Sequence, residues 1–367
     1  MQNNQTEPAS STYFHRKALQ LGLPIAGNFE LTARCNFRCP MCYVHLDSEQ
    51  IRQRGQELTA QQWMTIARDA RDRGMLFVLL TGGEPLVRKD FFEIYRGMKE
   101  LGLLISINTN GSLLSGEILE RFLEDPPVRF NISLYGGSNE TYRDFCGQPA
   151  YDQVRENIRR LREAGVEVSL NVSVTPRNQA DLPKIYQDAV DLDVNVKMAS
   201  YMYPPIRIDP QQCGGGYRMT PQEAAKLRMQ WDALRLTPQE LTQRKENIRA
   251  LVQQQQDCPV EGEDGVFCRA GRTAFWITWD GRMLPCGMMP GPEAYPLATG
   301  FDQAWEQIRR GTAEIRLPED CKNCDKRPIC SVCAAVCVTE TGGFAQPPQY
   351  MCQMTQHLLE LASEETI

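Results

Sequence analysis

Short apolar runs alternate with longer amphipathic stretches along residues 28–200. Continuous apolar runs are typical of buried strands, and apolar residues that recur every three or four positions are typical of helices. The apolar runs predict strands over residues 29–33, 76–81, 104–109, 129–134, 166–174 and 194–199. The amphipathic stretches between them predict helices over residues 59–73, 90–101, 115–124, 151–164 and 182–192.

Local signals support the ends of these helices. Thr59 precedes one amphipathic stretch as a predicted N-cap, and Gly102 and Gly165 follow two others as predicted helix stops. Strands that alternate with helices predict an α/β fold with a parallel sheet and right-handed crossovers. The pattern alone allows either a barrel or an open, doubly wound sheet. In both arrangements ligands bind at the carboxyl ends of the strands.

Composition divides the chain into four parts. Residues 1–27 predict a poorly structured lead-in with one short helix, and residues 28–203 contain the alternating core. Pro204-Pro205 and a run of three glycines mark the end of the core, and residues 204–256 predict a helical connector. Residues 257–367 are rich in cysteine and show little periodicity, so we expect them to fold around metals rather than around an apolar core.

The charge of the chain is nearly balanced and dispersed. With 40 basic and 46 acidic residues and a formal net charge of -6, the sequence predicts no nucleic-acid partner. No apolar run is long enough to span a membrane, and the N-terminus does not resemble a signal peptide. We therefore expect a cytoplasmic protein. In a reducing compartment, the clustered cysteines among its 14 are expected to be metal ligands rather than disulfides, while Cys146 and Cys213 stand alone.

Three cysteines, Cys35, Cys39 and Cys42, lie directly after the first predicted strand. Clustered soft thiolates bind zinc or an iron–sulfur cluster. Three thiolates leave one ligand position open to a group that is not protein. A zinc loop with a missing ligand, or an accidental group of buried thiols, is the alternative at this point.

This loop resembles the cysteine loop of the radical S-adenosylmethionine (SAM) superfamily, and Thr81-Gly82-Gly83-Glu84-Pro85 resembles the superfamily's Gly-Gly-Glu motif. The resemblance implies a partial (β/α)6 TIM-like barrel. It also implies a [4Fe-4S] cluster on Cys35, Cys39 and Cys42, whose fourth iron binds the amino and carboxylate groups of SAM. The implied SAM contacts are Gly82, Gly83 and Glu84 at the amino group, Met41 at the adenine, Ser133 at the ribose, and Asn110 in the pocket. Ordinary turn and packing roles are the alternatives for these residues.

One position departs from the family pattern. Related enzymes often carry Arg immediately before a glycine where this chain has Cys146 before Gly147. Arg143 is a candidate to replace that arginine in holding a carboxylate. Cys146 is expected either to face the active site or, as the simpler alternative, to be a small buried residue.

The cysteines between Cys258 and Cys352 resemble the SPASM extension of radical SAM enzymes. That resemblance implies two auxiliary [4Fe-4S] clusters, and therefore three clusters in all. Family members usually have three residues after the equivalent of Cys330, whereas this chain has two before Cys333 and three more before Cys337, and we favour Cys333 as the ligand. Auxiliary cluster I would then be held by Cys258, Cys268, Cys286 and either Cys333 or Cys337, and auxiliary cluster II by Cys321, Cys324, Cys330 and Cys352. Structural zinc sites are the alternative.

The resemblance implies that SAM is cleaved to a 5′-deoxyadenosyl radical, which abstracts hydrogen from a C–H bond of the substrate. SPASM members act mostly on peptides and proteins. We therefore expect an oxidoreductase that matures a ribosomally made peptide or protein (RiPP maturation) through a thioether or carbon–carbon crosslink. The sequence assigns no catalytic residue to that step. A low-potential electron donor of the flavodoxin or ferredoxin type is the expected redox partner.

Three other functions are weighed against this expectation. A sulfatase-type formylglycine maturase is expected to carry Asp after the equivalent of Cys286, but here Gly287 follows. Biosynthesis of a cofactor or a tetrapyrrole is an alternative function that the sequence leaves open. A non-enzymatic iron–sulfur or zinc interaction protein would have no use for the Gly-Gly-Glu motif. Only about 27 residues precede the first strand, so a leader peptide is expected to need either a separate binding protein or another surface of this chain.

Overall fold

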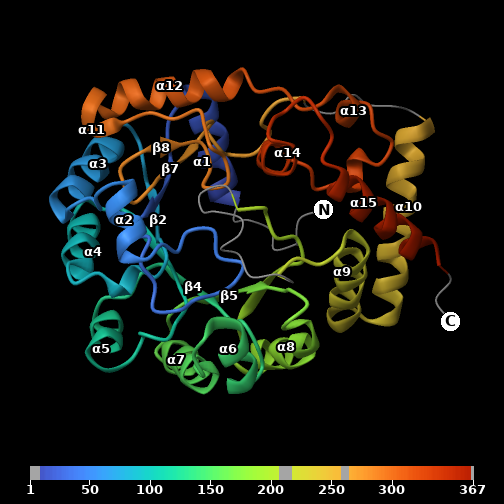
Figure 1. The fold of residues 1–367 in the computed structure, drawn as a ribbon, viewed down its shortest axis with the longest axis horizontal. Coiled ribbons are helices and arrows are strands. Elements are labelled where there is room, and N and C mark those ends of the chain that lie inside the picture. The colour runs from blue at the N-terminus through green and yellow to red at the C-terminus, as the bar shows by residue number, and fades with distance from the viewer. Residues whose placement is uncertain (1–8, 206–216, 258–263, 365–367) are drawn as a thin grey trace.

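An eight-stranded sheet organises the structure, a computed structural model that describes residues 9–205, 217–257 and 264–364 (Figure 1). Six strands pair in parallel in the order β6-β5-β4-β3-β2-β1. This order confirms the predicted α/β fold with a partial barrel of strand–helix units. The bounds are Ala26–Glu30 (β1), Phe77–Thr81 (β2), Leu104–Thr109 (β3), Arg129–Ser133 (β4), Val168–Ser173 (β5) and Asn195–Ala199 (β6).

The predicted helices form and cover the outside of this sheet (Figure 1). Their apolar stripes are buried against the strands, as Ile94, Phe122 and Ile158 show with 0% exposure. The hydroxyl of Thr59 accepts a hydrogen bond from the Gln62 backbone N–H at 3.2 Å, which confirms the predicted N-cap. The bounds are Ala60–Asp72 (α3), Phe91–Glu100 (α4), Gly116–Glu124 (α5), Tyr151–Glu163 (α7) and Leu182–Asp191 (α8).

The first strand begins and ends three residues earlier than predicted. Leu31 and Ala33 are fully buried, which explains why they read as strand residues. Instead, they continue beyond the sheet and lead into the cysteine loop. Helices α2 (Ser48–Arg54) and α6 (Asn139–Cys146) were not predicted. The short helix expected in the lead-in is the longer helix α1 (Ala9–Leu21). Asp47 and Ser138 cap α2 and α6 with their side chains, a signal present in the sequence.

Two strands from the range 257–367 join the same sheet. β7 (Ala274–Ile277) pairs in parallel with β1, and β8 (Met283–Leu284) pairs antiparallel with β7. The side-chain amide of Asn28 donates to the Phe275 carbonyl at 3.0 Å across this junction. Helix α12 (Phe301–Ala313) covers β7, with Phe301 and Trp305 packed against the fully buried ring of Phe275. The core of the molecule is therefore continuous from β6 to α12.

Helices α9, α10 and α15 lie together on the other side of the molecule from α3 and α4, whereas α11 lies beside α3 (Figure 1). The loops that carry most of the C-terminal cysteines run between α12 and α15. Among the described residues, no helix combines the length and apolar character needed to cross a membrane. The bounds are Pro221–Arg235 (α9), Pro238–Asp257 (α10), Pro296–Thr299 (α11), Glu319–Lys322 (α13), Ala334–Thr341 (α14) and Gln349–Ser363 (α15).

Candidate active site

A cavity of about 440 Å³, hereafter the central cavity, opens at the carboxyl ends of the parallel strands. It brings together eight of the nine residues predicted for the first cluster and its SAM, which are contributed by the cysteine loop and by the ends of β2, β3 and β4. These residues are Cys35, Cys39, Met41, Cys42, Gly82, Gly83, Asn110 and Ser133. Residues far apart in the sequence therefore meet in one cavity at the edge where α/β folds bind their ligands.

Backbone and amide groups surround the sulfurs of the cysteine loop. The Phe37 N–H donates to the Cys35 sulfur at 3.3 Å, and the His45 N–H donates to the Cys42 sulfur at 3.3 Å. The loop is closed by a bond from the Cys42 N–H to the Cys39 carbonyl at 3.1 Å. Donors aimed at sulfur stabilise the negative charge of thiolates and of the clusters they bind. Burial acts in the opposite direction and raises the pKa of Cys35, so these donors suit a thiolate that a bound metal keeps deprotonated.

The three thiols of the loop fit an iron–sulfur cluster. Across residues 9–205, 217–257 and 264–364, no three His, Cys, Asp or Glu side chains converge on a single ion. In a [4Fe-4S] cluster each thiolate binds a different iron, so the ligand sulfurs surround a larger object. Cys35, Cys39 and Cys42 all line the central cavity, which matches that requirement.

The second βα turn lies directly against the start of the cysteine loop. The Gly83 N–H donates to the Thr32 carbonyl at 2.8 Å, and the Glu84 N–H donates to the Arg34 carbonyl at 2.9 Å. A Cβ atom on Gly83 would lie 2.4 Å from the Arg34 carbonyl oxygen, so only glycine allows this approach. The Gly-Gly pair thus positions the cysteine loop as well as lining the cavity.

Glu84 is the predicted SAM contact that does not line the central cavity. Its carboxylate is fully buried and accepts from the Thr109 hydroxyl at 2.9 Å and from the Asn110 N–H at 2.7 Å. Burial raises the pKa of Glu84 to about 7, and the hydrogen bonds from Asn110, Leu86 and Thr109 oppose that rise. In this structure Glu84 therefore holds the second and third strand ends together.

Asn110 connects the third strand end to the cysteine loop. Its side-chain amide donates to the Asn36 side chain at 2.8 Å and lies 3.8 Å from the Cys35 sulfur. Its carbonyl oxygen accepts from the Ser112 hydroxyl at 2.7 Å. The predicted pocket residue is thus also a support for the first cysteine.

Cys146 is buried, with 1% exposure, and lies behind Cys39. A hydrogen bond between the two thiols, followed by burial, raises the pKa of Cys39. The Cys146 carbonyl accepts from the Arg38 N–H at 3.0 Å. The residue that departs from the family pattern therefore supports the cysteine loop from within the core.

Several residues of the central cavity were not predicted. They are polar or aromatic side chains on the ends of β3, β5 and β6 and on the segments that follow β4 and β6. The alternation within β5 contains the signal, since Ser169, Asn171 and Ser173 interrupt an otherwise apolar strand at every second position. The main additions to the cavity wall are Asn108, Tyr135, Asn171, Lys197, Tyr201 and Tyr203.

A second cavity, of about 550 Å³ and hereafter the C-terminal cavity, lies between α13 and α15. All four cysteines predicted for auxiliary cluster II line it: Cys321, Cys324, Cys330 and Cys352. Burial, followed by the charges of the other three sulfurs, raises the pKa of Cys321 to about 11. Lys326 and Arg327 also line the cavity, where their positive charges favour an anionic cluster.

Of the residues predicted for auxiliary cluster I, Cys286 and Cys333 lie next to Met288 and Tyr203 in the wall of the central cavity. Burial raises the pKa of Cys268, and the negative charge of the Cys333 sulfur raises it by a smaller amount. Tyr203 is close to both Cys333 and Cys286. Cys337 is fully buried in α14, and burial followed by Cys321, Cys333 and Cys330 raises its pKa to about 12. Cys258 and the lone Cys213 lie outside the described residues.

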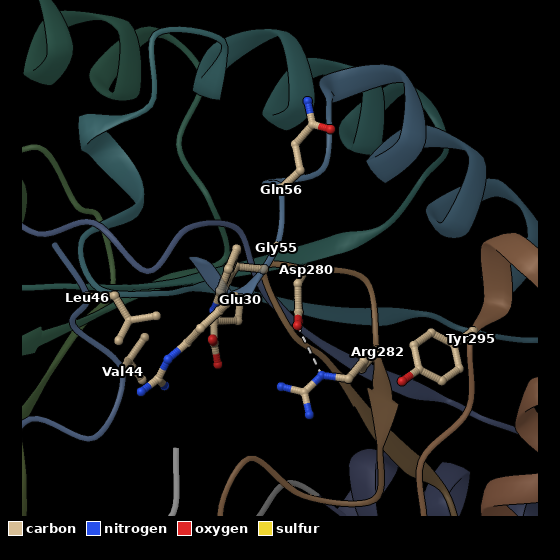
Figure 2. A pocket seen from close by; sticks show the side chains of 10 residues that line it. Glu30, Val44, Leu46, Gly55, Gln56, Asp280, Arg282 and Tyr295 are labelled. Atoms are coloured by element: carbon tan, nitrogen blue, oxygen red, sulfur yellow. Dashed lines mark hydrogen bonds and ion pairs between the residues drawn. The ribbon is translucent and has the colours of Figure 1, made fainter. Parts of the chain in front are cut away.

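A polar pocket of about 520 Å³ lies at the carboxyl ends of β1 and β7 and shares Val44 with the central cavity. Figure 2 shows Val44 and Leu46 on one side of this polar pocket, and Arg282 and Tyr295 on the other. The Trp276 indole donates to the Glu30 carboxylate at 2.9 Å, and the Arg282 guanidinium donates to Asp280 at 3.1 Å. The polar pocket therefore offers fixed charges next to the central cavity.

Comparison with known families identifies the domain around the central cavity. The model of the radical SAM superfamily matches residues 29–189, which run from the first strand through α8. Residues 29–189 form a radical SAM domain. The radical SAM family implies a [4Fe-4S] cluster and SAM, and the three cysteines of the loop lie in the central cavity within this domain. The chain is an enzyme.

Two kinds of curated relative share the radical SAM domain. An AdoMet-dependent heme synthase from Methanosarcina barkeri is 26% identical over 339 residues, covering 88% of this chain and 94% of the relative. A probable GTP 3′,8-cyclase from Saccharolobus solfataricus is 37% identical over 169 residues, covering 45% of this chain and 53% of the relative. The second similarity is thus confined to about half of each protein.

Two solved structures share the fold over nearly the whole chain. Streptococcus suis SuiB bound to its precursor peptide SuiA has a TM-score of 0.65 and 16% identity, covering 95% of this chain and 83% of that chain. Native anSMEcpe with bound AdoMet and the Cp18Cys peptide has a TM-score of 0.68 and 16% identity, covering 92% and 96%. The common fold therefore extends beyond the radical SAM domain into the cysteine-rich C-terminal region.

Proposed function

We propose that the chain is a three-cluster radical SAM enzyme that modifies a peptide or protein by hydrogen abstraction from a C–H bond. The observation that carries the proposal is the division of the cysteines into separate groups: three at the central cavity, four around the C-terminal cavity, and Cys268, Cys286 and Cys333 between them. A C-terminal region with two such groups corresponds to a SPASM extension.

Each group of residues has a definite task in this proposal. When bound, the reduced cluster on Cys35, Cys39 and Cys42 supplies the electron that splits SAM into methionine and a 5′-deoxyadenosyl radical. Gly82, Gly83, Met41, Ser133 and Asn110 would orient SAM in the central cavity. Phe37, Tyr135 and Tyr203 line the central cavity, where their rings would limit the access of water to the reacting atoms.

Two observations support a peptide or protein substrate. Both structural neighbours were solved with peptides bound, and each covers more than nine tenths of this chain. The polar pocket adjoins the central cavity and carries carboxylates, guanidiniums and a phenol, which suit the alternating donors and acceptors of a peptide. We propose a thioether or carbon–carbon crosslink as the product. The proposed partners are a low-potential flavodoxin or ferredoxin and a separate leader-binding protein.

Tetrapyrrole chemistry is the second candidate, because the heme synthase from M. barkeri is matched over almost its entire length. The sulfatase-type maturase is disfavoured by packing as well as by sequence. A Cβ on Gly287 would lie 2.8 Å from the indole of Trp276, so the aspartate expected at this position does not fit without movement of the ring.

Anaerobic reconstitution tests the proposed chemistry. We expect about twelve iron atoms per chain, and release of 5′-deoxyadenosine when SAM and dithionite are added. Cys39→Ala should abolish that release and lower the iron content by about four atoms. Cys213→Ala, a cysteine outside all three proposed groups, is the control and should keep both properties. Stoichiometric zinc in place of iron would contradict the proposal.

A second experiment separates the two substrate classes. Reconstituted enzyme is incubated with SAM and either a cysteine-rich precursor peptide encoded beside its gene or a carboxylated porphyrin. Mass spectrometry then follows the loss of two hydrogens from the peptide or the shortening of a porphyrin side chain. We expect change in the peptide alone. Change in the porphyrin alone would establish tetrapyrrole chemistry.

A further inference from the structure

Tyr203 lies where the central cavity meets the C-terminal cysteines. It follows β6 within the segment Tyr201–Tyr203, and all three residues of this segment line the central cavity. The Tyr203 hydroxyl also lies 4.0 Å from the sulfur of Cys333, within hydrogen-bonding range of a large, polarisable acceptor. The Tyr203 side chain therefore borders the central cavity and contacts a proposed ligand of auxiliary cluster I.

The same wall contains a second link to that cluster. Met288 lines the central cavity, and its backbone N–H donates to the Cys286 sulfur at 3.4 Å. Tyr203 and Met288 thus separate the central cavity from Cys333 and Cys286. The cysteines of auxiliary cluster II lie around a different cavity, which neither of these residues lines. Of the two proposed auxiliary clusters, auxiliary cluster I is therefore the one beside the central cavity.

Neighbouring residues hold the Tyr203 ring in place. Its ring packs edge-on against Tyr201 at a centroid distance of 4.9 Å, and Tyr201 packs against Tyr350 at 5.4 Å. The guanidinium of Arg218 lies 4.2 Å above the Tyr350 ring and 2.5 Å from Glu340. Glu340 also accepts a hydrogen bond from the Tyr201 hydroxyl at 2.6 Å. This network joins β6, α14 and α15 and fixes the direction of the Tyr203 phenol.

A tyrosine phenol ordinarily titrates at about pH 10, so Tyr203 has a proton to donate at neutral pH. A protonated phenol beside a thiolate can act only as the donor, because the thiolate carries no hydrogen. Hydrogen bonds to cluster sulfurs are one of the means by which proteins set reduction potentials.

We propose that the Tyr203 hydroxyl donates a hydrogen bond to the Cys333 sulfur and thereby raises the reduction potential of auxiliary cluster I. This inference rests on the proposed three-cluster function and deepens it. It assigns Tyr203 as a positioning and tuning residue and Cys333, rather than Cys337, as the cluster ligand. The bond favours the reduced, more negative cluster because the donor partly neutralises the added charge.

Tyr203→Phe tests the hydrogen bond while keeping the ring. Redox titration of the reconstituted holoenzyme, followed by electron paramagnetic resonance, reports the potential of each cluster. We expect one cluster to become harder to reduce by about tenfold in equilibrium constant, which is ~59 mV for a one-electron couple. The other two potentials should not move. Tyr95→Phe is the control, since the Tyr95 hydroxyl donates to the Asp125 carbonyl and not to sulfur.

Two cysteine variants identify the affected cluster. Cys333→Ala should remove the signal that Tyr203→Phe shifts and about four iron atoms, whereas Cys337→Ala should keep both. Unchanged potentials in Tyr203→Phe, with three clusters present, would overturn this inference and leave the proposed function intact. Loss of the signal in Cys337→Ala instead of Cys333→Ala would overturn the ligand assignment. A wild-type enzyme with about four iron atoms would reject the three-cluster function itself.

Discussion

Backbone contacts between Gly83 and the residues before Cys35 determine the position of the cysteine loop. No side chain takes part in the hydrogen bonds from Gly83 to Thr32 and from Glu84 to Arg34. A loop held in this way depends on the absence of a Cβ atom rather than on the chemistry of a side chain. The Gly-Gly-Glu motif therefore has a structural task that is separate from SAM binding.

Gly83→Ala is expected to displace the cysteine loop, because the new methyl group would lie 2.4 Å from the Arg34 carbonyl oxygen. The variant should lose about four iron atoms and release little 5′-deoxyadenosine, while the signals of the auxiliary clusters persist. Gly343→Ala is the matched control, since nothing lies within 4 Å of its Cβ position. Full iron content in Gly83→Ala would refute this explanation.

Glu84 gives the SAM-free enzyme a specific dependence on pH. Its pKa is about 7 in the folded chain and 4.5 ordinarily, so between these values only the unfolded chain ionises. The free energy of unfolding should then fall by up to about 1.4 kcal/mol per pH unit as the pH rises, and the loss should stop above about pH 7. Urea unfolding of wild type and Glu84→Gln across this window measures the effect. Parallel curves for the two proteins would contradict it.

The sequence predicted which residues meet at the active site better than what each one contacts. Two observations were sufficient to place these residues at the carboxyl-terminal edge of the sheet. One is the spacing of Cys35, Cys39 and Cys42, and the other is the position of Gly82 and Gly83 after a strand. The buried hydrogen bonds of Glu84 were not predictable. They depend on how closely the end of the third strand, where Thr109 lies 25 residues later in the sequence, approaches the Glu84 carboxylate. The pairing of Cys146 with Cys39 likewise exists only in the fold.

At the scale of elements, α15 combines two tasks on two faces. Met351, Met354 and Leu358 are buried, with exposures of 5% or less, while Cys352 on the same helix lines the C-terminal cavity. The helix is therefore expected to remain folded through its apolar face when its metal ligand is removed.

Cys352→Ala should lower the iron content by about four atoms and increase hydrogen exchange in residues 321–330, while exchange in α15 changes little. Hydrogen-exchange mass spectrometry on the reconstituted enzyme measures both regions. Gln353→Ala, at the neighbouring position of the same cavity wall, should leave the iron content as in wild type. Melting of α15 in Cys352→Ala would show that the cluster, rather than the apolar face, holds the helix.

The alternating strands and helices of the barrel were predictable from the sequence, whereas the single short strand β7 was not. Strong periodicity identified the helices of the barrel within two residues at either end. β7 was missed because it is a single short strand, followed by Thr278 and Gly281, in a stretch dominated by cysteines and turns. Its partner β1 is more than 240 residues away in sequence, and no local pattern encodes such a pairing.

At the scale of the whole molecule, Phe275 joins the barrel to the C-terminal region. Its fully buried ring contacts Phe29 on one side and Phe301 and Trp305 on the other. Phe275→Ala is expected to lower the free energy of unfolding by about 3–5 kcal/mol, since it opens a cavity at this junction. Tyr295→Ala, which removes a ring that is 47% exposed, is the control and should cost much less. Anaerobic urea unfolding compares the two variants.

The pairing of β7 with β1 has a consequence for the order of events during synthesis. β1 is translated more than 240 residues before its second neighbour β7, so one of its edges has no partner until the segment through Ile277 has left the ribosome. Contacts between such distant segments form slowly. The nascent protein thus passes through a stage in which the cysteine loop is already present beside an uncovered strand.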